Sequence, residues 1–580
     1  MTEIPIPHQP AAAGGGGGNG PRDGRPPVHP SVSEAGRFLC AGTYLDAEYR
    51  DQVIDELYVH EERIVAPSYG FDASRVLAHA LRARRVELGW AAGVLGAWFV
   101  GSLLTGGALA ALLFPFLLLS LADWLRARGI PLLRFLSVLL RVYVWVALLG
   151  IVLFLFGLAL TGAGGPGGLL ALLFGGQSFG SSSSLGGGPF EDSGASLALW
   201  WPPIVFAGVV TVVGLQRGHV ARTIATDLSP ERYADPSADP AEAHPGVRLA
   251  RVRKRIRSEQ HAPMIMYDIN NPFAGAGEPY RPWQLSVELR PRADLGPGVT
   301  PRHVTNAHIA ERIVPLLERL RVPSPHGSPQ AEAAVLDRMR ELVVDECVFL
   351  PAGGLPHRDA APVAPQQFAE HRAAAIEEGG ERRRHFLRVR VGGWDENMVV
   401  TVFVRVHTQG GMMMLEVAPH VLLPARIAFH NADADAERYL NNNRFGKAVW
   451  AVRHTPGSFV ASLATLGRGF ASWWRIATGG HGGARPEGPR LSVRELGSQN
   501  QGSLFHLMDL DRYLKTIQDR VVGGVTMTLH EAGWHTEEFA QRAVHVAEGG
   551  VYIQSVHDSA FSVGGTGHHN STHRGSGSGR

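Results

Sequence analysis

Four long apolar runs lie between residues 88 and 215, and they predict membrane-spanning helices. The runs cover residues 88–104, 108–122, 142–160 and 197–215. A helix of about 17 residues rises about 26 Å, close to the roughly 30 Å of a bilayer core, so even the two shorter runs are candidate spans. Thr105, Gly106 and Gly107 separate the first two runs. This glycine pair predicts a hairpin turn rather than one long helix.

The basic residues beside these runs predict the side of the membrane on which each loop lies. Arginines lie before the first run, between the second and third, and after the fourth, whereas residues 105–107 and 161–196 contain no Lys or Arg. Because basic residues concentrate on the cytoplasmic side of spans, four spans place every basic flank and both chain ends in the cytoplasm. Three spans would put basic flanks on both sides, and a buried soluble hairpin does not fit the continuously apolar third run.

The sequence therefore predicts a membrane α-helical protein with four transmembrane helices, cytoplasmic N and C termini, and a C-terminal α+β cytoplasmic region. The expected organisation is a disordered tail at 1–35, a cytoplasmic helical module at 36–87, a four-helix transmembrane region at 88–215 with a Gly/Ser-rich external loop at 161–196, a linker with a basic cluster at 216–263, an α+β cytoplasmic domain at 264–425, a mostly helical cytoplasmic region at 426–563 and a disordered tail at 564–580.

Alternating and helical patterns predict the elements of the soluble parts. Strands are expected at 264–269, 284–289, 386–391, 399–406 and 412–417, and helices at 303–320, 331–344, 504–522 and 526–545, with a terminal strand pair at 551–554 and 560–563. In the module 36–87, apolar residues from Leu45 to Ile64 recur at helical spacing, and Pro67 is expected to end that helix.

Two further stretches are candidates for contact with the membrane surface. A basic cluster in the linker can attract anionic headgroups at about 1 kcal/mol per charge, with a solvated linker helix as the slightly favoured alternative. An apolar stripe at helical spacing either lies in the membrane interface or faces a soluble core, and the sequence favours neither. The cluster is Arg251, Arg253, Lys254, Arg255 and Arg257, and the stripe is Phe459, Leu463, Leu466, Phe470 and Trp473.

Composition narrows the setting. The net charge is +2, which gives no general signature of nucleic-acid binding. Abundant Ala, Gly and Pro with almost no Lys is typical of a high-GC bacterial genome. The two cysteines, Cys40 and Cys347, lie far apart in sequence, so neither a disulfide framework nor a cysteine metal motif is expected.

Three motifs with catalytic associations occur in the wrong context. Residues 162–167 fit G-x-G-x-x-G and residues 176–180 fit G-x-S-x-G, but both lie in a glycine-rich tract without the strand and helix that these motifs need. His530, Glu531 and His535 resemble a zinc-protease motif, except that the second histidine lies five residues from the first instead of four. The scattered histidines of the α+β domain match no common zinc spacing. No catalytic site, cofactor or metal is therefore predicted.

Three stretches resemble a family of uncharacterised multi-pass membrane proteins from actinobacteria. They are residues 38–85 with Ala66-Pro67-Ser68, the loop Asn271-Pro272-Phe273-Ala274-Gly275-Ala276-Gly277, and residues 491–552. The resemblance implies a bacterial plasma-membrane location. It implies no activity and no catalytic residues. The four-span arrangement, in turn, predicts that most of the soluble mass lies in the cytoplasm.

Three classes of function remain open. The favoured one is a membrane-anchored cytoplasmic module that senses or scaffolds, with the lipid bilayer, anionic lipids and an unidentified cytoplasmic protein as candidate partners. A channel or membrane-perturbing effector is an alternative, although charged residues are nearly absent from the spans and Gly93, Gly96 and Gly101 are suited to close helix packing. A membrane-associated enzyme with an unrecognised site is the third, because residues that meet only in space leave no sequence motif.

Overall fold

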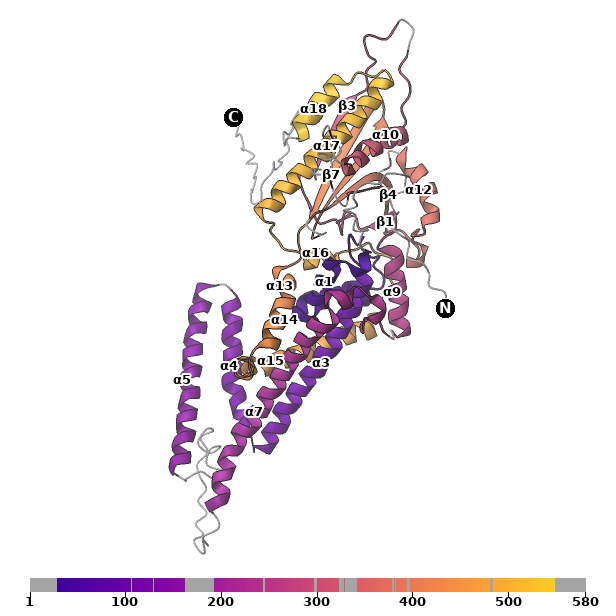
Figure 1. Cartoon of the computed structure of the whole chain (residues 1–580). Helices are drawn as coiled ribbons and strands as arrows, with labels where there is room; N and C mark the ends of the chain where they lie inside the picture. The colour runs from indigo at the N-terminus through magenta and orange to yellow at the C-terminus, as the bar shows by residue number, and fades with distance from the viewer. Residues whose placement is uncertain are drawn as a thin grey trace, which may run out of the picture. The chain divides into compact units, whose positions relative to one another are not determined.

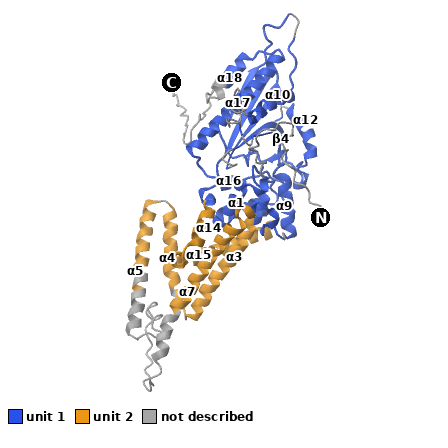
Figure 2. Cartoon of the chain, in the orientation of Figure 1, with its two compact units in different colours: residues 1–78, 233–430, 480–580 blue, residues 79–232, 431–479 orange. Residues whose placement is uncertain are grey.

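The computed structural model describes residues 29–105, 107–128, 130–161, 192–243, 246–296, 300–322, 328, 339, 342–377, 380, 382–393, 397–479 and 483–547. The chain divides into two compact units, coloured separately in Figure 2. Unit 1 comprises residues 1–78, 233–430 and 480–580, and unit 2 comprises residues 79–232 and 431–479. Residues 431–479 thus belong with the apolar helices, so the region expected as one cytoplasmic part at 426–563 is shared between the two units.

A β-sheet forms the centre of unit 1. In the described residues its strand order is β1-β4-β5-β6-β7-β2, and β3 also pairs with β7. β1 and β4 are parallel, whereas the other paired strands are antiparallel. The strands are β1 (Met264–Tyr267), β2 (Glu278–Pro279), β3 (Trp283–Glu288), β4 (Leu342–Pro351), β5 (Arg384–Gly393), β6 (Met398–Gln409) and β7 (Met412–Leu422). The five predicted strands of the α+β domain are confirmed.

Alternation of side chains gives this sheet two different faces. Leu387, Val389 and Val402 belong to the face that packs against the helices α10 (Asn306–Glu318), α17 (Leu504–Glu531) and α18 (Glu537–Ala547) (Figure 1). The other face contributes Phe349, Phe386 and Phe403 to an aromatic cluster. Gly410 and Gly411, with φ of 59° and 79°, form the two-residue turn that joins β6 to β7.

Unit 1 contains further helices in its described residues. They are α1 (Glu34–Leu45), α2 (Ala47–Ile54), α9 (Val247–Glu259), α12 (Phe368–Ile376), α13 (Ile427–His430) and α16 (Val493–Gly497). α8 (Pro230–Tyr233) lies at the boundary between the units.

The N-terminal predictions need two corrections. Residues 29–35 of the tail expected at 1–35 are structured: Pro30–Val32 form a 3₁₀ turn, and the Ser33 hydroxyl accepts the N–H of Gly36 at 3.1 Å to cap α1, whereas residues 1–28 lie outside the described residues. The helix expected from Leu45 with its end at Pro67 begins at Ala47, because the Asp46 carboxylate accepts the N–H groups of Glu48 and Tyr49. It ends at Val59, after a π-helical turn over Asp55–Val59, so Pro67 does not end it.

Two helix predictions in the C-terminal half are wrong in their bounds. The helix expected at 331–344 fails at its end, because Leu342 to Val344 pair with β5 as the start of β4. The break expected between 522 and 526 is absent, since α17 continues to Glu531. A Cβ on Gly524 would lie 2.9 Å from Ile313 of α10, so this glycine permits close helix packing rather than a break. The chain turns instead at Gly533, with φ of 90°. The strand pair expected after residue 550 lies outside the described residues.

Unit 2 is built from helices alone in its described part. They are α3 (Ala73–Leu104), which begins in unit 1, α4 (Ala108–Ala127), α5 (Pro131–Thr161), α7 (Asp192–Arg222), α14 (Ala432–Asn441) and α15 (Arg444–Thr478) (Figures 1 and 2). Gly107, with φ of 91°, forms the predicted turn between α3 and α4. The core of unit 2 contains Trp98, Leu109, Phe116 and Val209.

Among the described residues, two helices are long and apolar enough to cross a membrane. They are Ala73–Leu104 and Pro202–Asp227, with mean hydropathies of 1.4 and 1.5. This is consistent with association with a membrane. The four expected spans are helical in their described residues, but only two of them meet this criterion, so the four-span arrangement is not confirmed.

Candidate functional site: an exposed apolar surface and a half-buried carboxylate

Besides the side chains of its core, unit 2 exposes many large apolar side chains on its helices. Phe99 on α3, Phe114 on α4 and Trp145 on α5 are 67%, 66% and 62% exposed. Soluble monomers rarely expose contiguous apolar patches of more than a few hundred Å². Phe135, Leu139 and further apolar residues of α5 extend this exposed surface. Contact of these exposed side chains with an apolar medium is favourable, whereas their contact with water is unfavourable.

Glycines of α3 fall into two environments. A Cβ on Gly101 would meet Leu109 of α4 at 2.8 Å and Val205 of α7 at 3.0 Å, so this glycine allows the three helices to approach closely. Gly93 and Gly96 have no neighbouring atom within 4 Å of such a Cβ among the described residues. The expected close packing is thus observed at Gly101 and not at the other two.

α15 packs against the other helices of unit 2 through small and polar side chains. Ser472 accepts a hydrogen bond from Arg84 of α3 at 2.8 Å, and Thr465 donates to Glu87 at 3.3 Å. A Cβ on Gly469 would lie 2.6 Å from Leu88, so only glycine fits there. This packing line consists of Ala451, Thr455, Ser462, Thr465, Gly469 and Ser472, all buried. Small residues at helix contacts are typical of membrane proteins.

The predicted apolar stripe of α15 faces outward. Leu463, Phe470 and Trp473 are 57%, 62% and 57% exposed, and Leu466 is half-buried. Phe459 is also half-buried, and its ring centroid lies 6.3 Å from that of Trp98. The interpretation of this stripe as the core-facing side of a soluble helix is therefore wrong for its three exposed members.

The predicted basic cluster lies on α9 in unit 1, and much of its charge is neutralised there. Arg253 is buried against Glu242, and Arg257 lies 3.2 Å from Glu242 and 3.4 Å from Asp72. Arg255 lies 3.8 Å from Asp359. Arg251 and Lys254 are exposed. Three of the five candidate residues thus take part in ion pairs within unit 1, which weakens the case for this cluster as a lipid-binding surface.

A half-buried charged group lies between α12 and the sheet. Glu346 of β4 accepts hydrogen bonds from Arg372 of α12 and from Nε2 of His385 on β5, the latter at 2.9 Å. Burial raises the pKa of Glu346, but the hydrogen bonds from His385 and Arg372 outweigh it and bring the pKa to about 2. Glu346 is therefore a permanent carboxylate at neutral pH. The sequence did not reveal this group, because its members lie on three separate elements.

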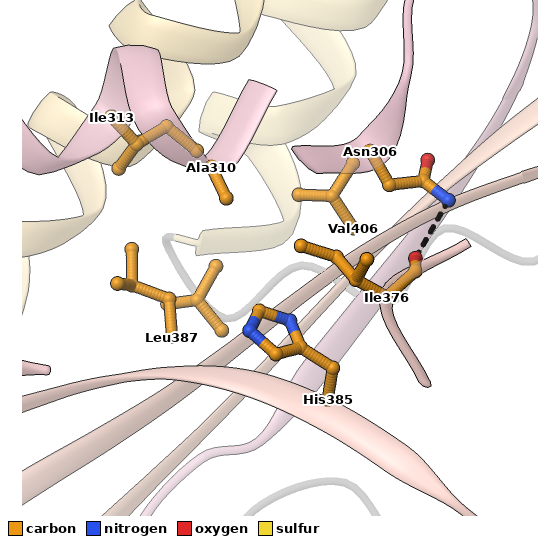
Figure 3. A pocket seen from close by; sticks show the side chains of 8 residues that line it. Asn306, Ala310, Ile313, Ile376, His385, Leu387 and Val406 are labelled. Carbon is orange, nitrogen blue, oxygen red and sulfur yellow. Dashed lines mark hydrogen bonds between the residues drawn. The ribbon is translucent and has the colours of Figure 1, made fainter. Parts of the chain in front are cut away.

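The cavity beside His385 is too small for an organic substrate. Its volume is about 10 Å³, near the minimum that one water molecule needs. The His385 ring lies among apolar side chains such as Ile376 and Leu387, and Asn306 donates to the Ile376 carbonyl at 3.0 Å (Figure 3). The carboxylate of Glu377 already accepts the first N–H groups of α10. This arrangement stabilises the junction of helix and strand and offers no nucleophile.

The residues of the motif resembling a zinc protease are also engaged elsewhere. Glu531 makes a two-point ion pair with Arg312 at 2.6 and 2.7 Å, and His535 lies 3.9 Å from Glu537. Within the described part of the chain, no group of three His, Cys, Asp or Glu side chains is placed to hold a metal ion. The two glycine motifs at 162–167 and 176–180 lie outside the described residues.

Both cysteines are fully buried. Burial raises the pKa of the Cys40 thiol well above its usual value and that of Cys347 to about 12. A thiol in such surroundings is a poor nucleophile. Neither cysteine is a candidate catalytic residue.

The loop that carries the family resemblance has a structural role. Phe273 lies within the aromatic cluster, with ring centroids 4.9 Å from Phe403 and 5.2 Å from Phe349. The carboxylate of Glu495 accepts the N–H groups of Gly275 and Gly277 at 2.7 and 2.9 Å. These contacts attach the loop to the sheet and to α16.

Comparison with known proteins gives one match. Residues 282–560 are similar to the family described as the AbeC-like domain. The match supports similarity to an uncharacterised family over this part of the chain, and it carries no information on activity, source organism or membrane location. No curated protein and no solved structure matches the chain.

Proposed function

We propose that this chain is a bacterial plasma-membrane protein in which unit 2 is embedded in the bilayer and unit 1 acts in the cytoplasm as a sensing or scaffolding module. The observation that carries the proposal is the exposed apolar surface of unit 2: large side chains such as Phe99, Phe114 and Trp145 are exposed, while α15 packs through small residues. Lipid accommodates this arrangement, and water does not.

The chemistry of unit 1 favours a binding role over catalysis. In its described part, the cavity beside His385 is too small for an organic substrate, and the charged groups considered above form ion pairs with one another. The four-span topology, with α4 and α5 crossing together with α3 and α7, belongs to this proposal. So do the cytoplasmic location of both chain ends and the existence of an unidentified cytoplasmic protein partner.

The test is extraction of the full-length chain from bacterial membranes. Alkaline carbonate removes peripheral proteins, so the chain should stay in the membrane pellet and be released only by detergent. Release by carbonate from intact, correctly folded material would contradict the proposal. Detergent-purified protein, captured after chemical cross-linking in cells, should also retain a cytoplasmic protein. Another multi-pass membrane protein, cross-linked and purified in the same way, identifies proteins that co-purify non-specifically.

A further inference from the structure

Three lines of side chains run along α15. The packing line defined above is flanked on one side by the apolar stripe, which Phe445, Val449 and Val452 extend toward the N-terminus at the same spacing of three or four residues. These three are 77%, 50% and 53% exposed. On the other side of the packing line, Lys447, His454, Arg468 and Arg475 recur at multiples of seven. At 100° per residue, this basic line lies about half a turn from the apolar stripe.

The charge of α15 has a single sign. Its sequence contains Arg444, Lys447, Arg453, Arg468 and Arg475 and no Asp or Glu. Basic side chains on one face and Phe, Leu and Trp on the other are typical of helices that lie in a membrane interface. Trp473 and Trp474, 57% and 54% exposed, have the amphipathic rings that favour the headgroup level.

Both halves of α15 contact neighbouring helices near the basic flanks of the spans. In the first half, Ala451 lies against Gly214, which is followed by Arg217 on α7. In the second half, Ser472 contacts Arg84, in the basic flank that precedes the first apolar run. In the proposed topology both flanks are cytoplasmic, so the two halves lie at the same side of the bilayer.

The length of α15 agrees with this placement. Its 35 residues correspond to about 52 Å of helix, far more than the roughly 30 Å of a bilayer core. A helix of that length across the membrane would protrude on both sides, and its basic line would lie in the hydrocarbon region. A helix that lies in the plane of the interface neither protrudes on both sides nor places its basic side chains in hydrocarbon.

We infer that α15 lies in the cytoplasmic interface of the membrane, with its apolar stripe among acyl chains and its basic line at anionic lipid headgroups. This inference rests on the proposed function, since it uses the embedded unit 2 as its reference. The ligand of unit 2 is then anionic phospholipid, and α15 is the helix that recognises it.

The experiment uses single added cysteines in the full-length chain, reconstituted into nanodiscs and labelled with an environment-sensitive fluorophore. Neighbouring positions on and off the apolar stripe form matched pairs: Leu463→Cys with Ala464→Cys, and Phe470→Cys with Ala471→Cys. Ala464 and Ala471 are exposed but lie about 100° away from the stripe. The buried Cys40 and Cys347 should label poorly, and the unsubstituted chain corrects for their contribution.

Lipids with brominated acyl chains should quench the label at 463 and 470 at least threefold more than the label at 464 and 471. Equal quenching at all four positions would mean that lipid surrounds α15, and would overturn the interfacial placement. No quenching at any of the four would overturn it as well. Phe99→Cys on α3 is the reference: quenching at 99 alone refutes this inference and leaves the membrane anchor standing, whereas no quenching at 99 refutes the proposed function.

A second measurement tests the ligand. Spin-labelled phosphatidylglycerol and phosphatidylcholine report which lipid is enriched next to the protein in mixed nanodiscs. Enrichment of the anionic lipid should fall by at least half when Lys447, Arg468 and Arg475 are changed to Gln. The same number of changes at Arg512, Lys515 and Arg520 of α17 should leave it unaltered. Equal enrichment in the two variants would overturn the assignment of anionic lipid to α15.

Discussion

At the residue scale, Glu346 shows how a half-buried charge is stabilised in unit 1. Its carboxylate binds both Arg372 and His385, which hold its pKa at about 2 against the effect of burial. A carboxylate with a folded pKa below its unfolded value stabilises the fold above the unfolded pKa, near 4.5, and loses that contribution as the pH falls toward 2. The ionised Glu346 therefore ceases to stabilise the fold only in strong acid.

Glu346→Gln should lower the stability of the purified protein by about 2 kcal/mol at pH 7, since hydrogen bonds to a charged group are lost. The difference from the unsubstituted chain should narrow between pH 4.5 and pH 3, where the native carboxylate also loses its advantage. Thermal unfolding in detergent at both pH values measures this. Glu318→Gln, in an exposed pair 3.7 Å from Arg321, is the control and should change stability by less than about 0.5 kcal/mol. A difference for Glu346→Gln that stays constant with pH would contradict this account.

At the element scale, the loop at 271–277 depends on backbone geometry that only glycine supplies. Gly277 has a φ of 93°, and a Cβ there would lie 2.1 Å from the carbonyl oxygen of Val421 in β7. Gly354 has a similar φ of 107° but no atom within 4 Å of such a Cβ among the described residues. A side chain at Gly354 would therefore meet backbone strain alone, whereas one at Gly277 would meet both backbone strain and a steric clash.

Gly354→Ala should cost about 1 kcal/mol, the lower part of the range for an unfavourable backbone conformation. Gly277→Ala carries the same strain and also forces β7 and the loop apart, so its cost should be at least twice as large. The two unfolding midpoints, measured side by side in detergent, decide the matter. Equal midpoints would mean that the loop moves away freely and does not hold the sheet edge.

At the scale of the whole molecule, the basic flanks make a prediction about topology. A cytoplasm-dependent fluorescent reporter fused after Arg580 should be bright, because both chain ends are expected inside. A reporter active only outside the membrane should work when inserted at Ser182, in the loop at 161–196. Activity of the outside reporter at Arg580, with intact protein on a blot, would contradict the four-span arrangement.

The sequence was informative wherever a local pattern decides the structure. Alternation of apolar residues predicted the strands of the meander β5–β7, and Gly106–Gly107 predicted the turn between the first two apolar helices. It failed where a distant contact overrides the local signal. The sequence predicts separate helices on either side of Gly523 and Gly524, but in α17 Gly524 allows close contact with Ile313 of α10. It also predicts helix at Leu342 to Val344, where pairing with β5 makes a strand.

The sequence by itself determined the apolar runs, the sign of their flanks and the periodic stripe on α15, because these depend only on residue type and spacing. Tertiary structure alone decided which side of α15 is buried. Gly469 of the packing line lies against Leu88 of α3 at a distance that a larger side chain would not permit, Ala451 lies against Gly214 of α7, and Leu463, Phe470 and Trp473 consequently face outward. Periodicity identifies the faces of a helix, but only its neighbours select the one that is covered.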